Sequence, residues 1–189
     1  MITRRTLLAG TVLAAVGATA PRAAAAPILT DDGLYHESWF LESFLILPED
    51  LDGAAAKGKR FAVIWELKGC PACRQMHLVN LADPAIEGYI RERFDILQLN
   101  ILGAREVTDF DGEKLTEKQL ARKYGVRGTP TIQFFPDAAA GLAQRSPRER
   151  EVHRIQGYVE PKDFRTLFAY VADKAYERGT LGDYLKAQG

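Results

Sequence analysis

Two cysteines separated by two residues, Cys70 and Cys73, constrain this 189-residue chain more than any other feature. They follow an apolar run at 61–67 (FAVIWEL), which is typical of a buried strand. Pro71 comes directly after the first cysteine, where proline favours the first turn of a helix. The sequence therefore predicts a strand, a CxxC motif and a helix over residues 70–81 in immediate succession.

The position of the cysteine pair at a helix N-terminus favours thiol chemistry. Unpaired backbone N–H groups and the helix dipole stabilise a thiolate there, and thiol pKa values in such motifs fall to roughly 3.5–7.5. A thiolate attacks a substrate disulfide, and a second thiol resolves the mixed disulfide. We predict that Cys70 attacks and that Cys73, one turn into the helix and less exposed, resolves. This redox-active disulfide needs no further cofactor.

Other interpretations of the cysteine pair have less support. A structural staple gains little stability from a loop that encloses two residues. Cys70, Cys73 and His77 lie on one side of the predicted helix, but a closed zinc site takes four ligands and the chain has no second pair. We predict no metal ligands, with copper bound through thiolate and imidazole as an alternative.

A second motif, Gly128-Thr129-Pro130-Thr131, precedes a predicted strand at 131–135. Proline in this position starts a strand or lies in a tight turn. The bond before Pro130 can be cis, because X–Pro bonds lose most of the preference for trans. Taken alone, the motif leaves both isomers open.

The remaining pattern predicts an α/β fold with a mixed central sheet flanked by helices in a single domain. A β-α-β half is followed by a β-β-α half, and such an order produces a sheet covered by helices. Polar surface loops are expected at 103–112 and 137–150. The apolar residues at 39–47 predict one face of a helix or the segment that leads into it. The other predicted helices are 48–56, 70–81, 84–94, 116–124 and 161–176, and the predicted strands are 61–67, 95–102, 131–135 and 151–158.

The first 25 residues are typical of an export signal, because Arg4 and Arg5 precede an uncharged, largely apolar run at 6–20 and small residues at 23–26. The paired arginines resemble a twin-arginine signal. We expect cleavage near Ala25 and a periplasmic protein, with an uncleaved anchor as the alternative. Residues 26–56 are then an N-terminal extension packing on a domain at 57–189.

The charge balance excludes a strongly basic surface. Lysine plus arginine and aspartate plus glutamate number 25 each, so no basic excess supports nucleic-acid binding. Removing residues 1–25 takes away three arginines and leaves a mildly acidic protein. We expect a monomer that binds no nucleic acid.

The strand, the CxxC motif, the helix and the later Thr-Pro before a strand together resemble the thioredoxin superfamily, over about residues 57–176. The resemblance implies that a cis proline lies against the cysteine pair and that the backbone before it pairs with the substrate chain. It therefore assigns substrate binding to Pro71, Ala72, Thr129 and Pro130. It also implies a protein-disulfide reductase acting on protein disulfides or thiols.

Three stretches, WELKGCPACRQMH, LQLNILGAREVTDFDG and YGVRGTPTIQFF, resemble the SoxW group, the periplasmic thioredoxins of bacterial sulfur oxidation. This resemblance implies a reductant that receives electrons from a membrane thiol transporter and reduces a sulfur-carrier protein of thiosulfate oxidation. Two alternatives remain. One is a dithiol oxidase or isomerase for protein folding or cytochrome maturation, and the other is a thiol-based copper-binding module.

The chain also departs from common thioredoxins. Gly69 stands where they carry tryptophan, and Ile64 stands where they carry a buried aspartate. Proton handling for the resolving thiol then falls to another group. Glu66 and Lys68 are the nearest candidates, and His77 is a third candidate for tuning the thiols. The alternative for Glu66 and Lys68 is a solvated or structural charge, and the alternative for His77 is a packed or partly exposed helix residue.

Overall fold

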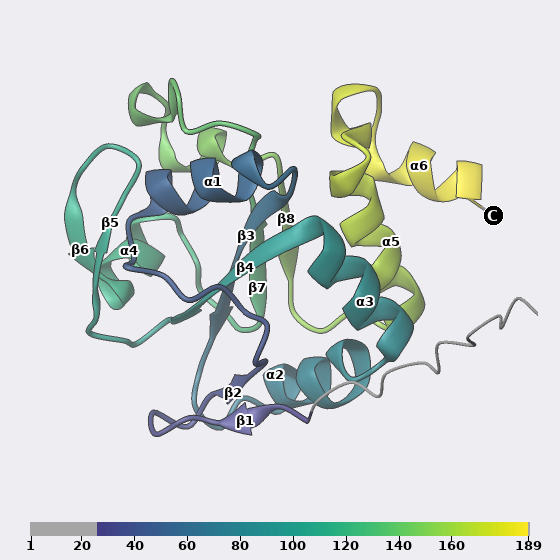
Figure 1. Cartoon of the computed structure of the whole chain (residues 1–189), viewed down its shortest axis with the longest axis horizontal. Coiled ribbons are helices and arrows are strands. Elements are labelled where there is room, and N and C mark those ends of the chain that lie inside the picture. Colours follow the sequence, from purple (N-terminus) through teal and green to yellow (C-terminus); the bar gives the residue numbers. More distant parts are fainter. Residues whose placement is uncertain (1–25, 189) are drawn as a thin grey trace, which may run out of the picture.

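A computed structural model describes residues 26–188, and the predicted export signal lies outside the described residues. Four strands form the central sheet in the order β4-β3-β7-β8 (Figure 1). Strand β3 (Arg60–Glu66) runs parallel to β4 (Phe94–Asn100) and antiparallel to β7 (Thr131–Phe134), and β7 pairs antiparallel with β8 (His153–Gln156). The prediction of an α/β domain with a mixed sheet is therefore confirmed.

Strand β3 is apolar on both faces because both faces are covered. Phe61, Val63 and Trp65 point into one core cluster, whereas Ala62 and Ile64 point into the other. This alternation explains why the strand reads as a continuous apolar run rather than as alternating apolar and polar residues. By the same alternation, Glu66 lies on the same face of the sheet as Ile64.

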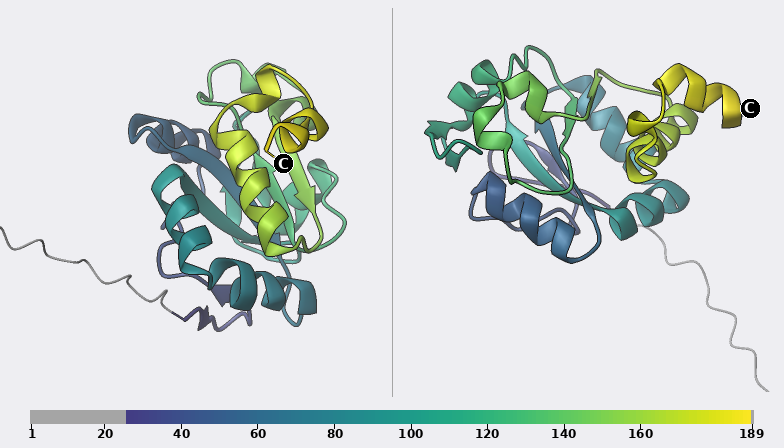
Figure 2. Two further views of the ribbon diagram at one scale, coloured as in Figure 1. Left: turned by 90° about the vertical axis from the view of Figure 1, so that its right-hand side faces the viewer. Right: turned by 90° about the horizontal axis from the view of Figure 1, so that it is seen from above.

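Helices cover the two faces of the sheet (Figure 2). Helices α1 (Leu47–Ala56) and α4 (Glu117–Lys123) pack on the side of Trp65. The opposite side is covered by four elements: α2 (Pro71–Gln75), η1 (Met76–Leu81), α3 (Pro84–Arg93) and α5 (Pro161–Ala172). The predicted helix at 70–81 thus begins as expected, but its second half, η1, is a π-helix. Among residues 26–188, no helix is both long and apolar enough to cross a membrane.

Two helix starts follow from local sequence signals. The carboxylate of Asp83 accepts hydrogen bonds from the backbone N–H groups of Ala85 and Ile86 at the start of α3. Thr116 and Gln119 form a reciprocal capping box at the start of α4. Both caps satisfy backbone donors that a first helical turn leaves unpaired.

Residues 39–46 form the lead-in to a helix, one of the two possibilities that the sequence left open, because helix α1 begins only at Leu47. The segment before it follows the outer edge of β4, where the Leu41 N–H donates to the Ile96 carbonyl. Phe40 is buried in the core, whereas the Phe44 side chain is 94% exposed. The apolar residues at helical spacing do not form a helix, because hydrogen bonding to a strand edge decides the conformation here.

Before this segment, the chain forms a short antiparallel hairpin of β1 (Ile28–Leu29) and β2 (Tyr35–His36).

Both predicted surface loops contain more structure than expected. The first predicted loop leads into a hairpin of β5 (Glu106–Thr108) and β6 (Lys114–Thr116). The second, 137–150, includes the short 3-10 helices η2 (Leu142–Gln144) and η3 (Pro147–Arg150). Leu142 and Arg150 are buried, so this segment is not simply a solvated loop.

The C-terminal helix ends earlier than predicted. Helix α5 stops at Ala172, and Lys174 adopts a left-handed backbone conformation with φ of 51°. The chain then forms a 3-10 turn η4 (Ala175–Glu177) and a further helix α6 (Leu181–Gln188), which the sequence analysis did not predict.

Candidate redox-active site

Cys70 is positioned by the start of helix α2. It is the N-cap residue, in an extended conformation, and Pro71 takes the first helical position. The Cys70 Sγ accepts a hydrogen bond from the backbone N–H of Cys73 at 3.1 Å. The two cysteines form a disulfide with a Cα–Cα distance of 5.3 Å. A thiolate at this sulfur would receive the same hydrogen bond and face the positive end of the helix.

The two sulfur-bearing residues differ in accessibility. Cys73 is only 2% exposed, whereas Cys70 is partly exposed and is followed by the exposed Pro71 and the half-buried Ala72. An incoming disulfide can therefore approach the first sulfur and not the second. This asymmetry matches the predicted division into an attacking and a resolving thiol.

The second motif lies against the first. Trp65, near the end of β3, pairs with Thr131 at the start of β7, so the residues before β7 lie beside the CxxC turn. The Thr129–Pro130 bond is cis, and 3.5 Å separates the Cys70 Sγ from the Thr129 carbonyl oxygen. The Gly157 N–H donates to the Pro130 carbonyl at 2.8 Å. Cys70 and Thr129, which are 59 positions apart in the chain, thus lie next to each other.

Two of the three predicted tuning residues meet in the core. The His77 Nε2 lies 2.7 Å from the Glu66 Oε1, and both side chains are at most 1% exposed. Lys68 does not join them: it is exposed, and its aliphatic stem lies over Gly33, where an added Cβ would come within 2.8 Å of the Lys68 Cγ.

Two residues that were not predicted from the sequence, Glu37 and Gln98, complete this buried cluster. Glu37, from the segment after β2, places its Oε1 2.8 Å from the His77 Nδ1. On strand β4, the Gln98 Nε2 donates to the Glu66 Oε2 at 3.1 Å and to the Tyr35 carbonyl at 2.6 Å. Glu37 lies 40 residues from His77 in the chain, and Gln98 lies 32 residues from Glu66. No local sequence pattern connects residues so far apart.

The hydrogen-bond partners of His77 determine its charge. A carboxylate only accepts hydrogen bonds, so both ring nitrogens of His77 act as donors and the ring is an imidazolium. Burial by itself lowers the pKa of His77, but the hydrogen bonds to Glu37 and Glu66 outweigh it and raise the pKa from 6.5 to about 9. His77 is therefore charged at neutral pH although it is buried.

We expect this protonation to make folding stability pH-dependent. Because the pKa is higher in the folded state, the contribution is fully present below about pH 6.5 and is lost as the pH rises through about 9. The difference corresponds to about 3 kcal/mol. Urea denaturation of the wild type across pH 6 to 10 measures it. A His77→Asn variant serves as the control, and an equal decline in that variant would contradict the assignment to His77.

The same contacts argue against a ligand role for His77 beside the cysteines. Both of its nitrogens face carboxylates, and both cysteines are in the disulfide. Within residues 26–188, no three histidine, cysteine or acidic side chains are grouped as a metal site requires. The copper alternative of the sequence analysis therefore gains no support from the geometry.

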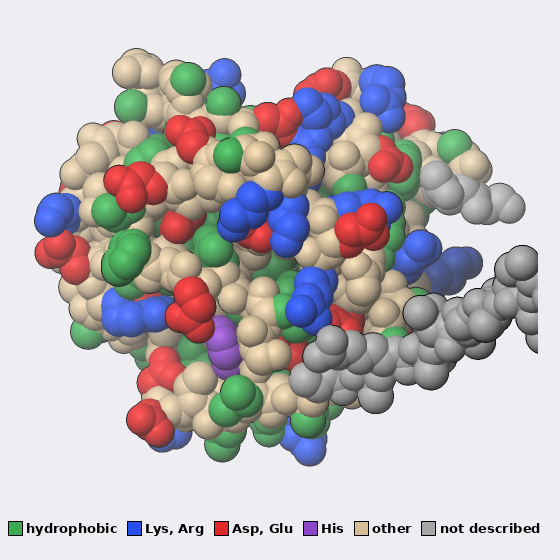
Figure 3. All heavy atoms as spheres, in the orientation of Figure 1, with side chains coloured by type: hydrophobic (Ala, Val, Ile, Leu, Met, Phe, Trp, Pro, Cys, Tyr) green, Lys and Arg blue, Asp and Glu red, His purple; other side chains and the backbone are tan. Residues whose placement is uncertain are grey.

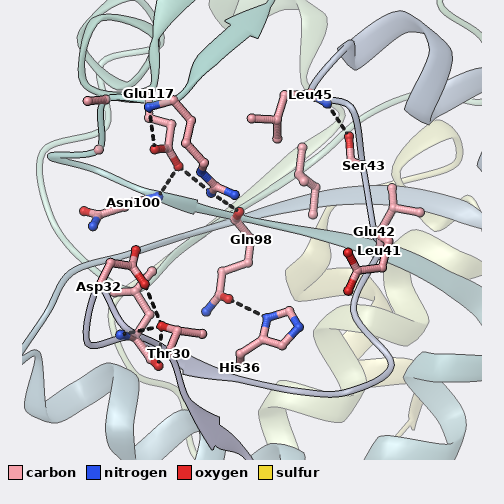
Figure 4. A pocket seen from close by; sticks show the side chains of 15 residues that line it. Thr30, Asp32, His36, Leu41, Glu42, Ser43, Leu45, Gln98, Asn100 and Glu117 are labelled. Carbon is pink, nitrogen blue, oxygen red and sulfur yellow. Dashed lines mark hydrogen bonds and ion pairs between the residues drawn. The ribbon is translucent and has the colours of Figure 1, made fainter.

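A cavity of about 490 Å³ lies beside the outer edge of β4, away from the disulfide (Figure 4). His36 and Gln98 lie in its wall, and the His36 Nδ1 donates to the Gln98 Oε1 at 2.8 Å. Neither cysteine lines this cavity, so it is not the redox site.

The face of the molecule shown in Figure 3 carries interspersed basic and acidic side chains, in keeping with the balanced charge.

Comparisons with known proteins agree with this geometry. The Helicobacter pylori thioredoxin-fold protein superposes with a TM-score of 0.54 and 18% identity, covering 74% of this chain and 96% of that one. A thioredoxin from Thermus thermophilus superposes with a TM-score of 0.50 and 29% identity, covering 66% of this chain and 82% of that one. No curated protein matches this chain by sequence.

The fold and the disulfide define a thioredoxin-like redox protein of the thiol–disulfide oxidoreductase class. Residues 47–172 match the family model described as a thioredoxin-like domain. The chain belongs to this thioredoxin-like family.

Proposed function

We propose that this chain is an exported protein-disulfide reductase. It passes electrons from a membrane thiol transporter to a sulfur-carrier protein of thiosulfate oxidation. The observation that carries the chemical part is the asymmetry of the pair, with Cys70 accessible at the helix start and Cys73 buried. The similarity of three sequence stretches to the SoxW group supports the partners, and the features of residues 1–25 support export to the periplasm.

The reaction begins with the reduced protein, in which Cys70 is a thiolate and Cys73 a thiol. The Cys70 Sγ attacks the substrate disulfide, forms a mixed disulfide and releases one substrate thiolate. Cys73 then loses its proton, which passes through solvent to a released thiolate, and its sulfur attacks the Cys70 Sγ. The second substrate sulfur leaves, so two electrons have moved to the substrate and the protein disulfide has formed.

The substrate chain is proposed to lie along Pro71, Ala72, Thr129 and Pro130. These residues lie beside the accessible sulfur, and the Thr129 carbonyl is 3.5 Å from it. A backbone group at this distance holds an extended partner segment in line with the attacking sulfur. Positioning of this kind lowers the barrier because the reacting sulfurs are held in the productive geometry.

The Pro130→Ala variant tests the position of this groove. We expect the rate of disulfide reduction to fall about tenfold or more with protein substrates, because the turn that presents the Thr129 carbonyl is altered. Stopped-flow kinetics with a disulfide-bonded protein substrate measures the effect. Reduction of a small disulfide such as oxidised glutathione should change less. Unchanged rates with every protein substrate would place the groove elsewhere.

The partner assignment is tested by trapping. In a Cys73→Ser variant the mixed disulfide cannot be resolved, so the physiological partner remains attached to Cys70. The variant is expressed in the native host of this chain, and the adduct is identified by non-reducing gels and mass spectrometry. A sulfur-carrier protein in the adduct supports the proposal. Adducts made up of many folding secreted proteins would instead support the alternative of a dithiol oxidase or isomerase.

A further inference from the structure

Three cationic residues lie around the accessible sulfur of the redox site. Lys68 comes two residues before Cys70, so their Cα atoms are at most about 7 Å apart. The Arg74 N–H donates to the Cys70 carbonyl at 3.1 Å, which places Arg74 one turn into the same helix. Arg127 comes two residues before Thr129, whose carbonyl oxygen is 3.5 Å from the Cys70 Sγ. All three cations are therefore close to the sulfur that a substrate disulfide must reach.

These three cations are available to a partner. Lys68, Arg74 and Arg127 are exposed, and none of them forms an ion pair with a carboxylate of residues 26–188. Asp32 belongs to the hairpin whose Gly33 is covered by the Lys68 stem. The Asp32 carboxylate, however, accepts a hydrogen bond from the Thr30 hydroxyl at 2.6 Å and does not pair with the lysine.

The redox face is basic although the protein as a whole is mildly acidic. It is built by three segments that meet at the start of α2 and at the Thr129–Pro130 turn, namely 67–75, 126–131 and 156–160. These segments contain the three cations and a single acidic residue, the exposed Glu160, which gives them a net charge of +2. Without the three arginines of residues 1–25, the whole chain has 22 basic and 25 acidic residues. The positive excess at the redox face is therefore local.

We propose that the basic rim formed by Lys68, Arg74 and Arg127 selects protein substrates that carry acidic side chains beside their disulfide. Charges closer than the Debye length, about 8 Å at physiological salt, are only partly screened. Carboxylates that flank a substrate disulfide are therefore attracted to the rim as the disulfide approaches Cys70. Complementary charges raise the rate of association and disfavour partners of the opposite sign. This inference rests on the proposed function and adds the chemical class of its substrate.

Two disulfide-bonded peptides of equal length test this preference, one with glutamates and the other with lysines on either side of its cysteines. Reduced protein is mixed with each peptide in single-turnover stopped-flow experiments. Each rate constant is divided by that for dithiothreitol, which corrects for the intrinsic reactivity of the peptide. We expect the acidic peptide to react about tenfold faster at low salt, and the difference to vanish at 1 M salt, where the Debye length is about 3 Å. Equal rates at low salt, or faster reaction of the basic peptide, would overturn the proposal.

The Lys68→Gln/Arg127→Gln variant removes two charges of the rim and leaves the cysteines unaltered. We expect the ratio of the acidic to the basic rate constant to fall about fivefold at low salt. A change in the pKa of the attacking thiol would alter both rate constants by the same factor, so it would not change this ratio. An unchanged ratio in this variant would contradict a role of the rim in substrate choice.

A charge-matched control lies at the other end of the molecule. Arg178 and Lys186 are exposed and belong to the C-terminal region around α6, which lies far from α2 in two views (Figures 1 and 2). The Arg178→Gln/Lys186→Gln variant loses the same two residue types and should keep the wild-type ratio. An equal fall in both double variants would show that net charge, and not the rim, sets the preference.

The direction of electron flow is tested separately from this preference. A reduction potential typical of a folding oxidant would overturn the proposed function. The rim would then act on reduced acidic partners, because the same charges attract a partner whichever way the electrons move, and the same peptides in their dithiol form give the ratio with oxidised protein.

Discussion

We expect the replacement of Cys70 by serine to reduce disulfide exchange to the uncatalysed background. The hydroxyl of serine is not ionised at neutral pH, and the remaining Cys73 is only 2% exposed and cannot reach a substrate disulfide. Insulin reduction with dithiothreitol as electron source, followed by turbidity, measures the loss. The helix start is preserved, because serine is a favoured N-cap residue.

The Cys73→Ser variant is the control for this loss. It keeps the accessible sulfur and the helix N-terminus, so it forms a mixed disulfide in a single turnover and then stops. Trapping of substrate through Cys73 in the Cys70→Ser variant would reverse the two roles. Full turnover by either variant would contradict a dithiol mechanism.

We expect the replacement of Arg150 by alanine to lower the free energy of unfolding by about 3 kcal/mol. Its guanidinium lies 2.8 Å from both Asp109 and Asp111, and the first of these carboxylates is fully buried. The Arg150 Nε also donates to the Leu142 carbonyl at 2.9 Å, which ties the 137–150 segment to the domain. Removing the guanidinium leaves the buried Asp109 carboxylate with Lys123, the Tyr124 hydroxyl and the Phe110 N–H, and it removes the Nε donor from the Arg145 carbonyl.

Arg148 provides the matched control. It lies two residues earlier, its side chain is 69% exposed and it pairs with Glu151. Because exposed ion pairs contribute little, Arg148→Ala should change the free energy of unfolding by less than about 1 kcal/mol. Urea denaturation followed by circular dichroism compares the two variants. Equal losses would show that the buried ion pairs of Arg150 do not hold this segment.

The redox motif could be predicted from the sequence because its signals are local. The apolar run of β3, the helix start at Pro71 and the caps at Asp83 and Thr116 each depend on residues within a few positions. The meeting of Cys70 with the Thr129–Pro130 turn needed the family resemblance, since sheet pairing between β3 and β7 brings them together.

The parts that were missed depend on distant contacts. The spacing of Phe40 and Phe44 leaves a helix or its lead-in open. A hydrogen bond from this segment to β4 decides for the lead-in, in which one ring is buried and the other exposed. The burial and charge of His77 could not be predicted, because its partners Glu37 and Glu66 lie 40 and 11 residues away in the chain. The polar and charged composition of residues 137–150 predicts a solvated loop. In the structure, the buried Arg150 ties this segment to the domain through Asp109 and the Leu142 carbonyl.

The reduction potential of the Cys70–Cys73 pair tests the central claim most directly. Signal-free wild-type protein is equilibrated with glutathione and dithiothreitol buffers, and the fraction of disulfide is measured by alkylation and mass spectrometry. If the protein is a reductant, its reduction potential should lie near that of thioredoxin, about −270 mV. A value near about −120 mV, the level of a strong folding oxidant, would contradict the account and reverse the direction of electron flow.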